Sequence, residues 1–362
     1  MSRLSAELKK PSELSAAERE AWVSFTDHND ELASPYFRIE FADCCEEVRS
    51  DTRVIVGRKA DQIAGFLPLQ LGKFGYARPL AGPLGDVHGL IVPPGYDADP
   101  LDYMRAANVG LLEFHSAAGV RQAWRNHGVV QDGSWICDLA SGFDAYVDNR
   151  KKMSSSAMRN IRSRQRRLEA MEEGFEYRIE DFRPEVLSTV VAWKREQYRR
   201  TGVFDVFSVG WTGKLLAALL AKRSDRFRGT CSTLLIGNKI AAAHIGMASE
   251  KLSHYWFPVY DPDHSRVSPG ILLLMEILRD AAARGEIGMD LGPGNYRFKE
   301  EMGSYQVPLW QGCVMTRSAP CLLRHTADAL AEGFERLPVP GLASFPRRAM
   351  RKADKLAAFY AW

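Results

Sequence analysis

The stretch of residues 254–303 constrains the fold more than any other part of the chain. It opens with aromatic and β-branched residues up to Tyr260, which is typical of a strand. A loop rich in Asp, Pro, His and Ser follows, and Ser268-Pro269-Gly270 then begins an apolar segment. Because Ser favours the N-cap and Pro favours the first helical position, this pattern predicts a helix over residues 271–284.

A second strand and a short helix complete this stretch. Residues 287–291 form a short apolar run, Gly292-Pro293-Gly294 ends it, and residues 295–299 lead into the helix. A helix N-terminus presents unpaired N–H groups and the positive end of the helix dipole. The loop of residues 261–270 is therefore suited to bind phosphate, with Arg266 and Ser268 as further donors. The alternative is an ordinary helix cap in an α/β unit.

Length and composition favour a globular protein of more than one domain. The chain has 362 residues, of which 46% are hydrophobic and 26% are charged. Its longest apolar runs, such as residues 215–221, are too short to cross a bilayer, and its charged N-terminus lacks the apolar segment of a secretory signal. None of the six cysteines falls in a C-x-x-C pair. Together these features predict a cytoplasmic location without a metal site or disulfides.

The positive charge is unevenly placed, although the net charge is only +3. One of its two clusters falls in the basic helix predicted from about residue 144, and a helix so rich in Lys and Arg attracts anionic lipid, a nucleotide or nucleic acid. Arg162 and Arg166, one helical turn apart, could also hold a cyclic dinucleotide. The two basic clusters contain Arg150, Lys151, Lys152, Arg159, Arg162, Arg164, Arg166 and Arg167, and then Arg347, Arg348, Arg351, Lys352 and Lys355.

The C-terminal cluster lies among apolar and aromatic residues, including Phe359, Tyr360 and Trp362. This composition is typical of a helix that lies in a membrane interface. The alternative is a helix that packs on its own domain and leaves its charges in water.

Periodicity and turn signals predict the remaining elements. Helices are expected over residues 15–29, 37–48, 100–118, 144–173, 184–200, 210–222, 319–336 and 346–362. Strands are expected over residues 52–57, 63–71, 134–139, 175–180, 229–236, 240–249 and 307–316.

Residues 54–69 and 233–248 resemble each other. Both contain a strand, a Gly-x-Lys turn, an Ile-Ala pair and a second strand. This similarity favours two related half-chains, although one shared hairpin pattern can also arise by chance.

The order of these elements resembles the GNAT acetyltransferase fold. The segments HYWFPVYDPDHSRVSPGILLLMEILRDAAARG and DLGPGNYRFKEEMG, with the basic helix RKKMSSSAMRNIRSRQRRLEAM before them, are similar to one GNAT branch in particular. That branch occurs in bacterial cellulose and exopolysaccharide gene clusters, is related to FemAB-type transferases and carries two tandem GNAT-like domains. The resemblance covers roughly residues 20–316 and is strongest over residues 240–303.

The resemblance implies an α/β (α+β) fold. Two tandem GNAT-like domains are expected, each a mixed, mostly antiparallel sheet flanked by helices. The first would span residues 1–140, the second residues 141–318 with the acyl-CoA site, and residues 319–362 would form a C-terminal helical extension.

The resemblance also implies a donor and an acceptor. The donor co-substrate would be acetyl-CoA or another acyl-CoA, the acceptor an amino sugar or a lipid-linked saccharide in extracellular polysaccharide synthesis, and no metal is expected. Two positions depart from the family's phosphate loop, because Pro269 and Ile271 stand where small residues are usual. In the family pattern the pantetheine arm pairs with the strand of Tyr255 and Phe257, the pyrophosphate lies on Ser265, Arg266, Ser268 and Gly270, and Tyr296 protonates the departing thiolate.

Acyl transfer also needs a base for the amine. The candidates near strand ends are His254, Asp261, Asp290 and Glu300. Asp290 is preferred, because ligands gather at the carboxyl ends of strands. The alternatives are that Asp290 caps the following turn and that His254 is a core residue. Tyr296 could likewise be a packing residue.

Lys299 and Arg297 are candidates to bind the phosphate of an activated sugar, and Trp256 is a candidate to stack on the sugar. The alternatives are solvated helix charges and a core tryptophan. A FemAB-like transferase that uses aminoacyl-tRNA and a non-catalytic scaffold that senses a cyclic dinucleotide are the competing functions. An anionic membrane surface is a further expected partner for the basic patch of Arg159, Arg162, Arg166 and Arg167, and nucleic acid is not.

Overall fold

The computed structural model describes residues 3–118, 121–316 and Phe359. The chain divides into two compact units. Of the described residues, the first unit comprises 3–32, 41–118, 121–131, 309–316 and Phe359, and the second unit comprises Ala33–Glu40 and Asp132–Pro308. The helices predicted over residues 319–336 and 346–362, and the membrane-anchor interpretation of the second of them, lie outside the described residues, apart from Phe359.

The first unit contains a half-sheet in the order β1-β2-β3-β4-β5-β12. Its neighbouring strands are antiparallel, except β4 and β5, which are parallel. Its elements are β1 (Ser5–Lys9), α1 (Ala16–Asp27), α2 (Ile39–Val48), β2 (Thr52–Lys59), β3 (Gln62–Leu71), β4 (Tyr76–Arg78), α3 (Pro100–Ala106) and β5 (Leu111–Ala117), and it also takes residues of β12 (Tyr305–Met315).

Helix α1 begins where the sequence predicts. The Ser15 side chain accepts a hydrogen bond from the Glu18 N–H, and the Glu18 carboxylate accepts one from the Ser15 N–H, which is a capping box. On the buried face of the helix, Trp22 packs against Phe66 with ring centroids 5.1 Å apart. The same buried Glu18 also binds Lys9 at 2.8 Å and Arg58 at 2.6 Å.

Replacing Glu18 with Gln should lower the free energy of unfolding by about 2 kcal/mol at pH 7, because two charge-assisted bonds are weakened. Burial would raise the pKa of Glu18, but Lys9 and the Ser15 amide hold it below its usual value. A lowered carboxyl pKa contributes stability above the unfolded pKa that is lost as the pH falls through the folded one. Urea unfolding should therefore show the difference between wild type and E18Q shrinking below about pH 4. An equal difference at pH 7 and pH 3 would contradict this assignment.

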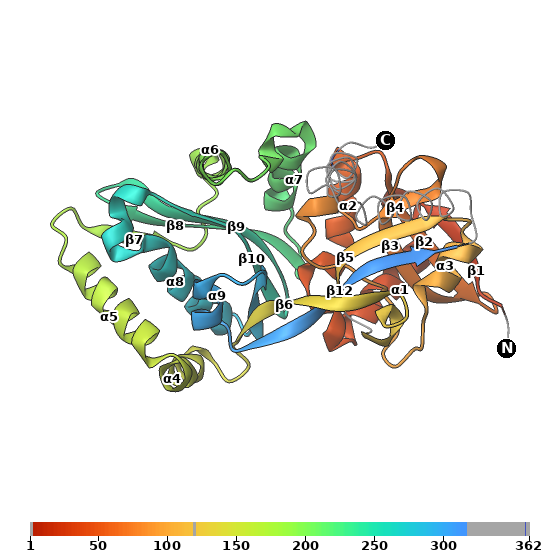
Figure 1. Ribbon diagram of the computed structural model, residues 1–362, viewed down its shortest axis with the longest axis horizontal. Helices are drawn as coiled ribbons and strands as arrows, with labels where there is room; N and C mark the ends of the chain where they lie inside the picture. The colour runs from red at the N-terminus through yellow and green to blue at the C-terminus, as the bar shows by residue number, and fades with distance from the viewer. Residues whose placement is uncertain (1–2, 119–120, 317–358, 360–362) are drawn as a thin grey trace, which may run out of the picture. The chain divides into compact units, whose positions relative to one another are not determined.

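The second unit contains a half-sheet in the order β6-β11-β10-β9-β8-β7, with only β10 and β11 parallel. Figure 1 shows α6 and α7 on one face of this sheet and α4, α5 and α8 on the other. The elements are β6 (Gly128–Asp138), α4 (Phe143–Met153), α5 (Ser155–Glu169), β7 (Phe175–Arg178), α6 (Pro184–Thr201), α7 (Gly210–Ala221), β8 (Phe227–Ile236), β9 (Lys239–Ser249), β10 (Leu252–Tyr260), α8 (Pro269–Ala283), β11 (Gly288–Pro293) and α9 (Arg297–Met302).

The single long helix predicted over residues 144–173 is wrong. The chain breaks at Ser154, whose backbone leaves the helical region (φ −140°, ψ 59°), so that α4 and α5 are separate helices. The apolar side of α5, with Met158, Ile161 and Leu168, packs into the core that α8 also covers. Two short helices follow this core more closely than one straight helix could.

The two units exchange their last strands. Strand β6 follows β5 in the chain, but its residues 134–138 pair with β11 in the second unit. Strand β12 follows β11, but its residues 310–315 pair with β5 in the first unit. Each half of the chain therefore completes the sheet of the other.

The two similar hairpins have the same register. Hairpin β2–β3 turns at Ala60-Asp61 and hairpin β8–β9 turns at Gly237-Asn238, all four with positive φ, as two-residue turns of this type require. In both, the third residue after the turn, Ala64 or Ala241, is skipped in the pairing as a β-bulge. The Ile-Ala pairs are thus equivalent, whereas the Gly-x-Lys segments are not.

The predicted fold class is confirmed: the chain is mixed α/β, with mostly antiparallel sheets flanked by helices. In the part of the chain that the structure describes, every helix is too short or too polar to pass through a bilayer.

Candidate functional site

The parallel strands β10 and β11 of the second unit pair over only three residues. Their register joins Leu252 to Gly288, Ser253 to Met289 and His254 to Asp290. Strand β10 continues to Tyr260 and β11 to Pro293, so the strands part after His254 and Asp290. The backbone N–H and C=O groups of residues 255–260 on the side toward β11 therefore do not pair with that strand. An extended ligand can hydrogen-bond to such an edge.

A buried polar group lies where the strands part. His254 is 1% exposed and Asp290 is 3% exposed, with His254 Nδ1 3.6 Å from Asp290 Oδ2. The Ser134 hydroxyl and the Gly292 N–H, the latter at 2.7 Å, both donate to Asp290 Oδ1. Burial would raise the pKa of Asp290, but His254, Ser134 and the Gly292 amide together hold it below its usual value.

An ionised carboxylate with two hydrogen-bond donors and an imidazole close by is a poor proton acceptor at neutral pH. The imidazole of His254 is the better base of the pair, and Asp290 is suited to orient it and to stabilise its protonated form. The hydrogen bond from the Gly292 N–H shows that Asp290 also caps the turn after β11. The turn-capping role that the sequence suggested for Asp290 is therefore compatible with a role beside His254.

Aromatic rings surround His254. The ring of Tyr36, from the short helix Pro35–Phe37, lies 5.0 Å from the His254 ring and 5.9 Å from that of Trp256. Trp256 is half-buried, whereas Phe257 is buried against Phe207 at 5.3 Å. Trp256 is therefore the ring of this strand that can meet a ligand beside His254, and the Phe257 side chain belongs to the core.

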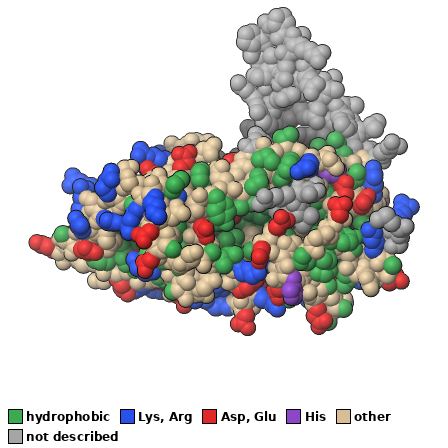
Figure 2. Space-filling model, turned by 90° about the horizontal axis from the view of Figure 1, so that it is seen from below, with side chains coloured by type: hydrophobic (Ala, Val, Ile, Leu, Met, Phe, Trp, Pro, Cys, Tyr) green, Lys and Arg blue, Asp and Glu red, His purple; other side chains and the backbone are tan. Residues whose placement is uncertain are grey.

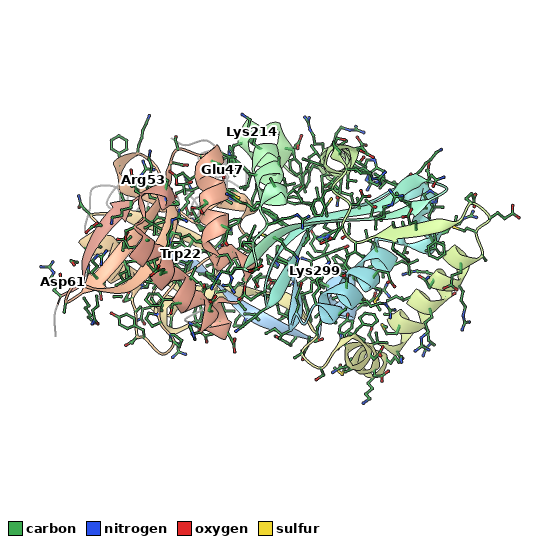
Figure 3. All side chains as sticks on the ribbon, turned by 180° about the vertical axis from the view of Figure 1, so that it is seen from behind. Trp22, Glu47, Arg53, Asp61, Lys214 and Lys299 are labelled. Atoms are coloured by element: carbon green, nitrogen blue, oxygen red, sulfur yellow. The ribbon has the colours of Figure 1, made fainter. Side chains whose placement is uncertain are left out.

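Lysines approach the site from α6 and α9. Lys299 is 8% exposed, lies in the interior of the second unit (Figure 3), and donates to the Pro293 carbonyl at 2.7 Å. Its ammonium is 5.4 Å from the ring of Tyr296, which is 64% exposed at the start of α9. Burial lowers the pKa of Lys194 on α6 to about 8, and the nearby charge of Lys299 adds to this shift. Two neighbouring ammonium groups favour an anionic ligand.

Arg297 differs from Lys299. Its exposed guanidinium is paired with Glu301 at 2.8 Å on the outside of α9. The structure therefore places Arg297 on the helix surface and Lys299 in the interior.

The N-terminus of α8 offers few free amides. Ser268 is the N-cap residue and Pro269 the first helical residue, as predicted, but Ser268 adopts φ 48° and its hydroxyl makes no cap hydrogen bond. Its carbonyl instead accepts from the N–H groups of Ile271 at 3.0 Å and Leu272 at 3.3 Å. Pro269 has no N–H. Among the described residues, Gly270 alone in this first turn keeps an N–H with no backbone acceptor.

The side chains of the predicted phosphate loop are accessible. Ser265 and Arg266 are exposed on the short 3₁₀ helix η8 (Pro262–Val267), and Ser268 is half-buried. The Ser265 carbonyl accepts from the Ser268 N–H at 3.0 Å, which closes the loop. An anion here would meet the guanidinium of Arg266 and the Gly270 amide.

Tyr255 points to the opposite side of the sheet. Its hydroxyl lies 3.5 Å from the Gly270 carbonyl, and its ring stacks on His244 with centroids 4.3 Å apart. Only the backbone of Tyr255 therefore faces the edge where β10 and β11 part.

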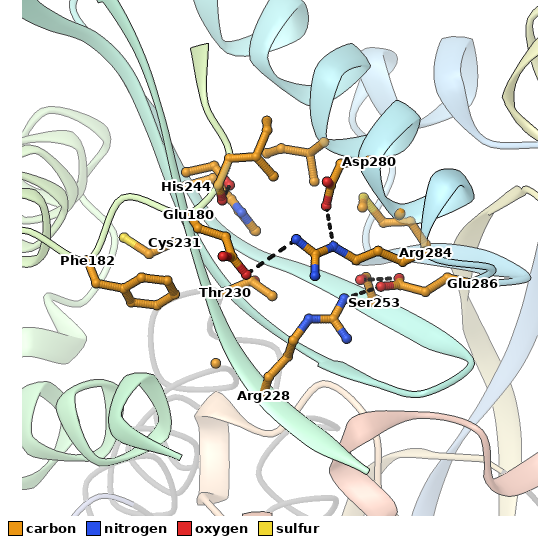
Figure 4. A pocket seen from close by; sticks show the side chains of 16 residues that line it. Glu180, Phe182, Arg228, Thr230, Cys231, His244, Ser253, Asp280, Arg284 and Glu286 are labelled. Atoms are coloured by element: carbon orange, nitrogen blue, oxygen red, sulfur yellow. Dashed lines mark hydrogen bonds and ion pairs between the residues drawn. The ribbon is translucent and has the colours of Figure 1, made fainter. Parts of the chain in front are cut away.

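On the α8 side of the sheet there is a shallow hollow that opens to solvent (Figure 4). His244 lines it, and burial lowers the pKa of His244 to about 3, so this imidazole stays neutral. At the hollow, Arg284 binds Asp280 at 2.7 Å and Arg228 binds Glu286. Its charged side chains are thus paired with each other, and none of the predicted catalytic residues lines it.

Ser134, Lys194 and Tyr36 are site residues that the sequence did not reveal. Ser134 reaches Asp290 from an exchanged strand, and Tyr36 comes from a segment more than 200 positions away in the chain. A lysine in the amphipathic pattern of α6 gives no signal of burial. In residues 3–118 and 121–316, no three His, Cys, Asp or Glu side chains are grouped as a metal site.

Residues 155–300 match the family model described as an acetyltransferase (GNAT) domain. The match includes His254, Asp290, Tyr296 and Lys299, and it spans less than half of the chain. The predicted GNAT domain is therefore confirmed for this part, whereas the exopolysaccharide branch stays a prediction.

Solved structures share the fold over nearly the whole chain. FemX has a TM-score of 0.59 and 10% identity, over 88% of this chain and 99% of that one. L-PGS from Bacillus licheniformis has a TM-score of 0.53 and 13% identity, over 88% and 96%. The C-terminal domain (DUF2156) of a putative lysylphosphatidylglycerol synthetase from Agrobacterium fabrum has a TM-score of 0.52 and 12% identity, over 86% and 96%. At such identities the likeness shows the fold alone. No curated protein sequence matches the chain.

Proposed function

We propose that the second unit transfers an acyl group from acetyl-CoA or another acyl-CoA to an amine. The observation that carries this proposal is the parting of β10 and β11 at His254 and Asp290, inside the residues that match the GNAT domain. The pantetheine arm would hydrogen-bond to the free edge of residues 255–260. The phosphates would lie at the start of α8, near Gly270 and Arg266.

In this reaction a C–N bond to the amine forms and the C–S bond of the thioester breaks. The imidazole of His254 accepts a proton from the attacking amine, and the Asp290 carboxylate stabilises the imidazolium that results. The Tyr296 hydroxyl donates a proton to the departing thiolate. Asp290 and Ser134 are positioning residues, since they act on His254 rather than on the substrate.

The acceptor is proposed to be an amino sugar or a lipid-linked saccharide, as in extracellular polysaccharide synthesis. Lys194 and Lys299 would attract the phosphate of an activated sugar. Trp256, half-buried beside His254, would stack on the apolar face of a sugar ring.

The direct test incubates the full chain with acetyl-CoA and a panel of free, nucleotide-linked and lipid-linked amino sugars, and follows N-acetylated product by mass spectrometry. Product that depends on both substrates supports the proposal. Complete absence of product, together with no change in melting temperature on adding acetyl-CoA, would refute the proposed donor.

Use of aminoacyl-tRNA as donor is the second candidate. It is favoured by the first turn of α8, where Gly270 alone among the described residues keeps a free backbone amide, because a compact diphosphate is usually held by several such amides. Transfer of a labelled amino acid from charged tRNA, with no turnover of acetyl-CoA, would select this candidate over the first. Stabilisation by a cyclic dinucleotide without turnover of either donor would instead select the non-catalytic scaffold.

Replacing Tyr296 with Phe should lower kcat about 100-fold and leave KM for the donor nearly unchanged, because only protonation of the thiolate is lost. Steady-state kinetics would measure both constants. Arg297→Gln is the matched control, since this neighbouring side chain is paired on the outside of α9. Full activity in Y296F, or an equal loss in R297Q, would remove Tyr296 from the mechanism.

A further inference from the structure

Helix α5 presents a continuous cationic face. Arg159, Arg162, Arg166 and Arg167 are all exposed, and their i, i+3, i+7 and i+8 spacing places them on one side of the helix. The opposite side is buried in the core of the second unit and carries Ala157, Met158, Ile161 and Leu168. The arginines therefore cannot turn inward.

The nearest acidic residues in the chain, Asp148 and Glu169, stand at the two ends of this face. Residues 150–168 contain no Asp or Glu, and within the described residues Arg162, Arg166 and Arg167 form no ion pair. Several exposed arginines elsewhere in the second unit are paired: Arg199 binds Glu196 at 2.6 Å and Arg284 binds Asp280 at 2.7 Å. Among the described residues, the cationic face of α5 thus gathers three arginines without an ion pair on one side of a single helix, which indicates that its charge meets an external anion.

An exposed apolar side chain comes just before α5 in the chain. Helix α4 ends at Met153, which is 73% exposed and follows the exposed Lys152. The chain breaks at the next residue, Ser154, before α5 begins. A bare apolar side chain among cations is typical of a surface that enters the headgroup region of a membrane. Figure 2 shows Lys and Arg side chains gathered at the end of the molecule where α4 and α5 lie, with some acidic side chains among them.

We propose that the α4–α5 surface, defined by Lys152, Met153, Arg159, Arg162, Arg166 and Arg167, docks on an anionic phospholipid membrane. Residues 150–169 contain no aromatic side chain, so this face lacks the rings on which proteins stack the bases of single-stranded nucleic acid. The exposed Met153 suits acyl chains and has no role against phosphates of RNA. Docking on lipid does not depend on which acyl donor the unit uses.

The α4–α5 surface also lies close to the candidate donor loop. Helix α5 packs against η8, which carries the exposed Arg266. A membrane bound at α5 would therefore hold the start of α8 near the lipid headgroups. This placement suits an acceptor that is itself carried by a lipid.

Co-sedimentation of the full chain with vesicles tests the proposal. Phosphatidylcholine vesicles that contain about 30% of the anionic lipid phosphatidylglycerol should bind the chain at low salt. Vesicles of pure phosphatidylcholine should not. Each arginine contributes about fivefold to partition onto an anionic surface, so R159Q/R162Q/R166Q should bind about 100-fold more weakly. Met153→Ser, which leaves the charge unchanged, should weaken binding several-fold.

The control variant R195Q/R199Q/R200Q removes the same charge from the exposed side of α6 and should bind like wild type. Equal loss in this control, or equal binding to uncharged vesicles, would overturn the proposal. The proposal would also be overturned if tRNA bound the chain more tightly than the vesicles do and through the same arginines of α5. The substituted arginines are exposed, and circular dichroism should show each variant melting at the wild-type temperature.

Discussion

Replacing His254 with Gln is expected to lower kcat/KM for acyl transfer by about 10²–10⁴-fold, because the amine loses its proton acceptor while the side chain keeps a similar size. His254 lies on β10 and its partner Asp290 lies on β11. The two residues form the last pair in the register before these strands separate. Steady-state kinetics with acetyl-CoA and the best acceptor would measure the loss. Far-ultraviolet circular dichroism should show an unchanged fold.

Asp290→Asn separates a positioning role from a purely structural one. The amide can still accept from Ser134 and Gly292, but it no longer stabilises a protonated imidazole. The rate should fall, and the rising limb of its pH profile should move to lower pH. Full activity in H254Q, or a D290N variant whose slower rate keeps the wild-type pH profile, would contradict the assigned roles.

Replacing Gly246 with Ala is expected to lower the free energy of unfolding by about 3 kcal/mol. A Cβ at this position of β9 would lie 2.3 Å from the His254 carbonyl oxygen and 2.7 Å from the His244 ring. The carbonyl belongs to the backbone of the neighbouring strand, so the clash is relieved only by moving β10, which carries the candidate base. Urea denaturation would report the loss as a lower midpoint with an unchanged slope.

Gly270→Ala is the matched control for this substitution. A Cβ there would meet nothing closer than the Tyr260 side chain, at 3.7 Å, so stability should stay within about 1 kcal/mol of wild type. If G246A were as stable as G270A, the close approach of β9 to β10 at His254 would be refuted.

Local sequence signals predicted most of the elements. The strand expected over residues 254–260 is Leu252–Tyr260, and the helix expected over residues 271–284 is Pro269–Ala283. Both follow from side-chain periodicity and turn residues, which depend on neighbours in the chain. The turn at Gly237-Asn238 was predicted for the same reason.

Which strands far apart in the chain pair with each other could not be predicted from these local signals. The exchange of β6 and β12 depends on which sheet edge each strand meets, and both strands would satisfy the same local pattern in either place. Ser134 therefore could not be assigned to the site, although its strand was predicted. The left-handed backbone of Ser268 likewise results from how η8 joins α8, against the usual preference of Ser at an N-cap.

The candidate site was predicted in part. His254 and Asp290 both stood out as polar residues at strand ends, and the structure brings them together. The preference for Asp290 as base arose because burial and hydrogen-bond donors are invisible in the sequence, whereas in the structure Asp290 is buried, accepts from Ser134 and Gly292, and lies beside His254. The sequence also could not show that Lys299 lies inside while Arg297, two positions before it, lies outside.

Hydrogen exchange of the full chain with and without acetyl-CoA tests the central claim most directly. If the parted edge of β10 takes the acyl donor, the amides of residues 255–260 and of Gly270 should gain protection, and the hairpin β2–β3 of the first unit should exchange as before. Protection that falls elsewhere, or no change at saturating acetyl-CoA, would contradict the proposal that this edge binds the donor.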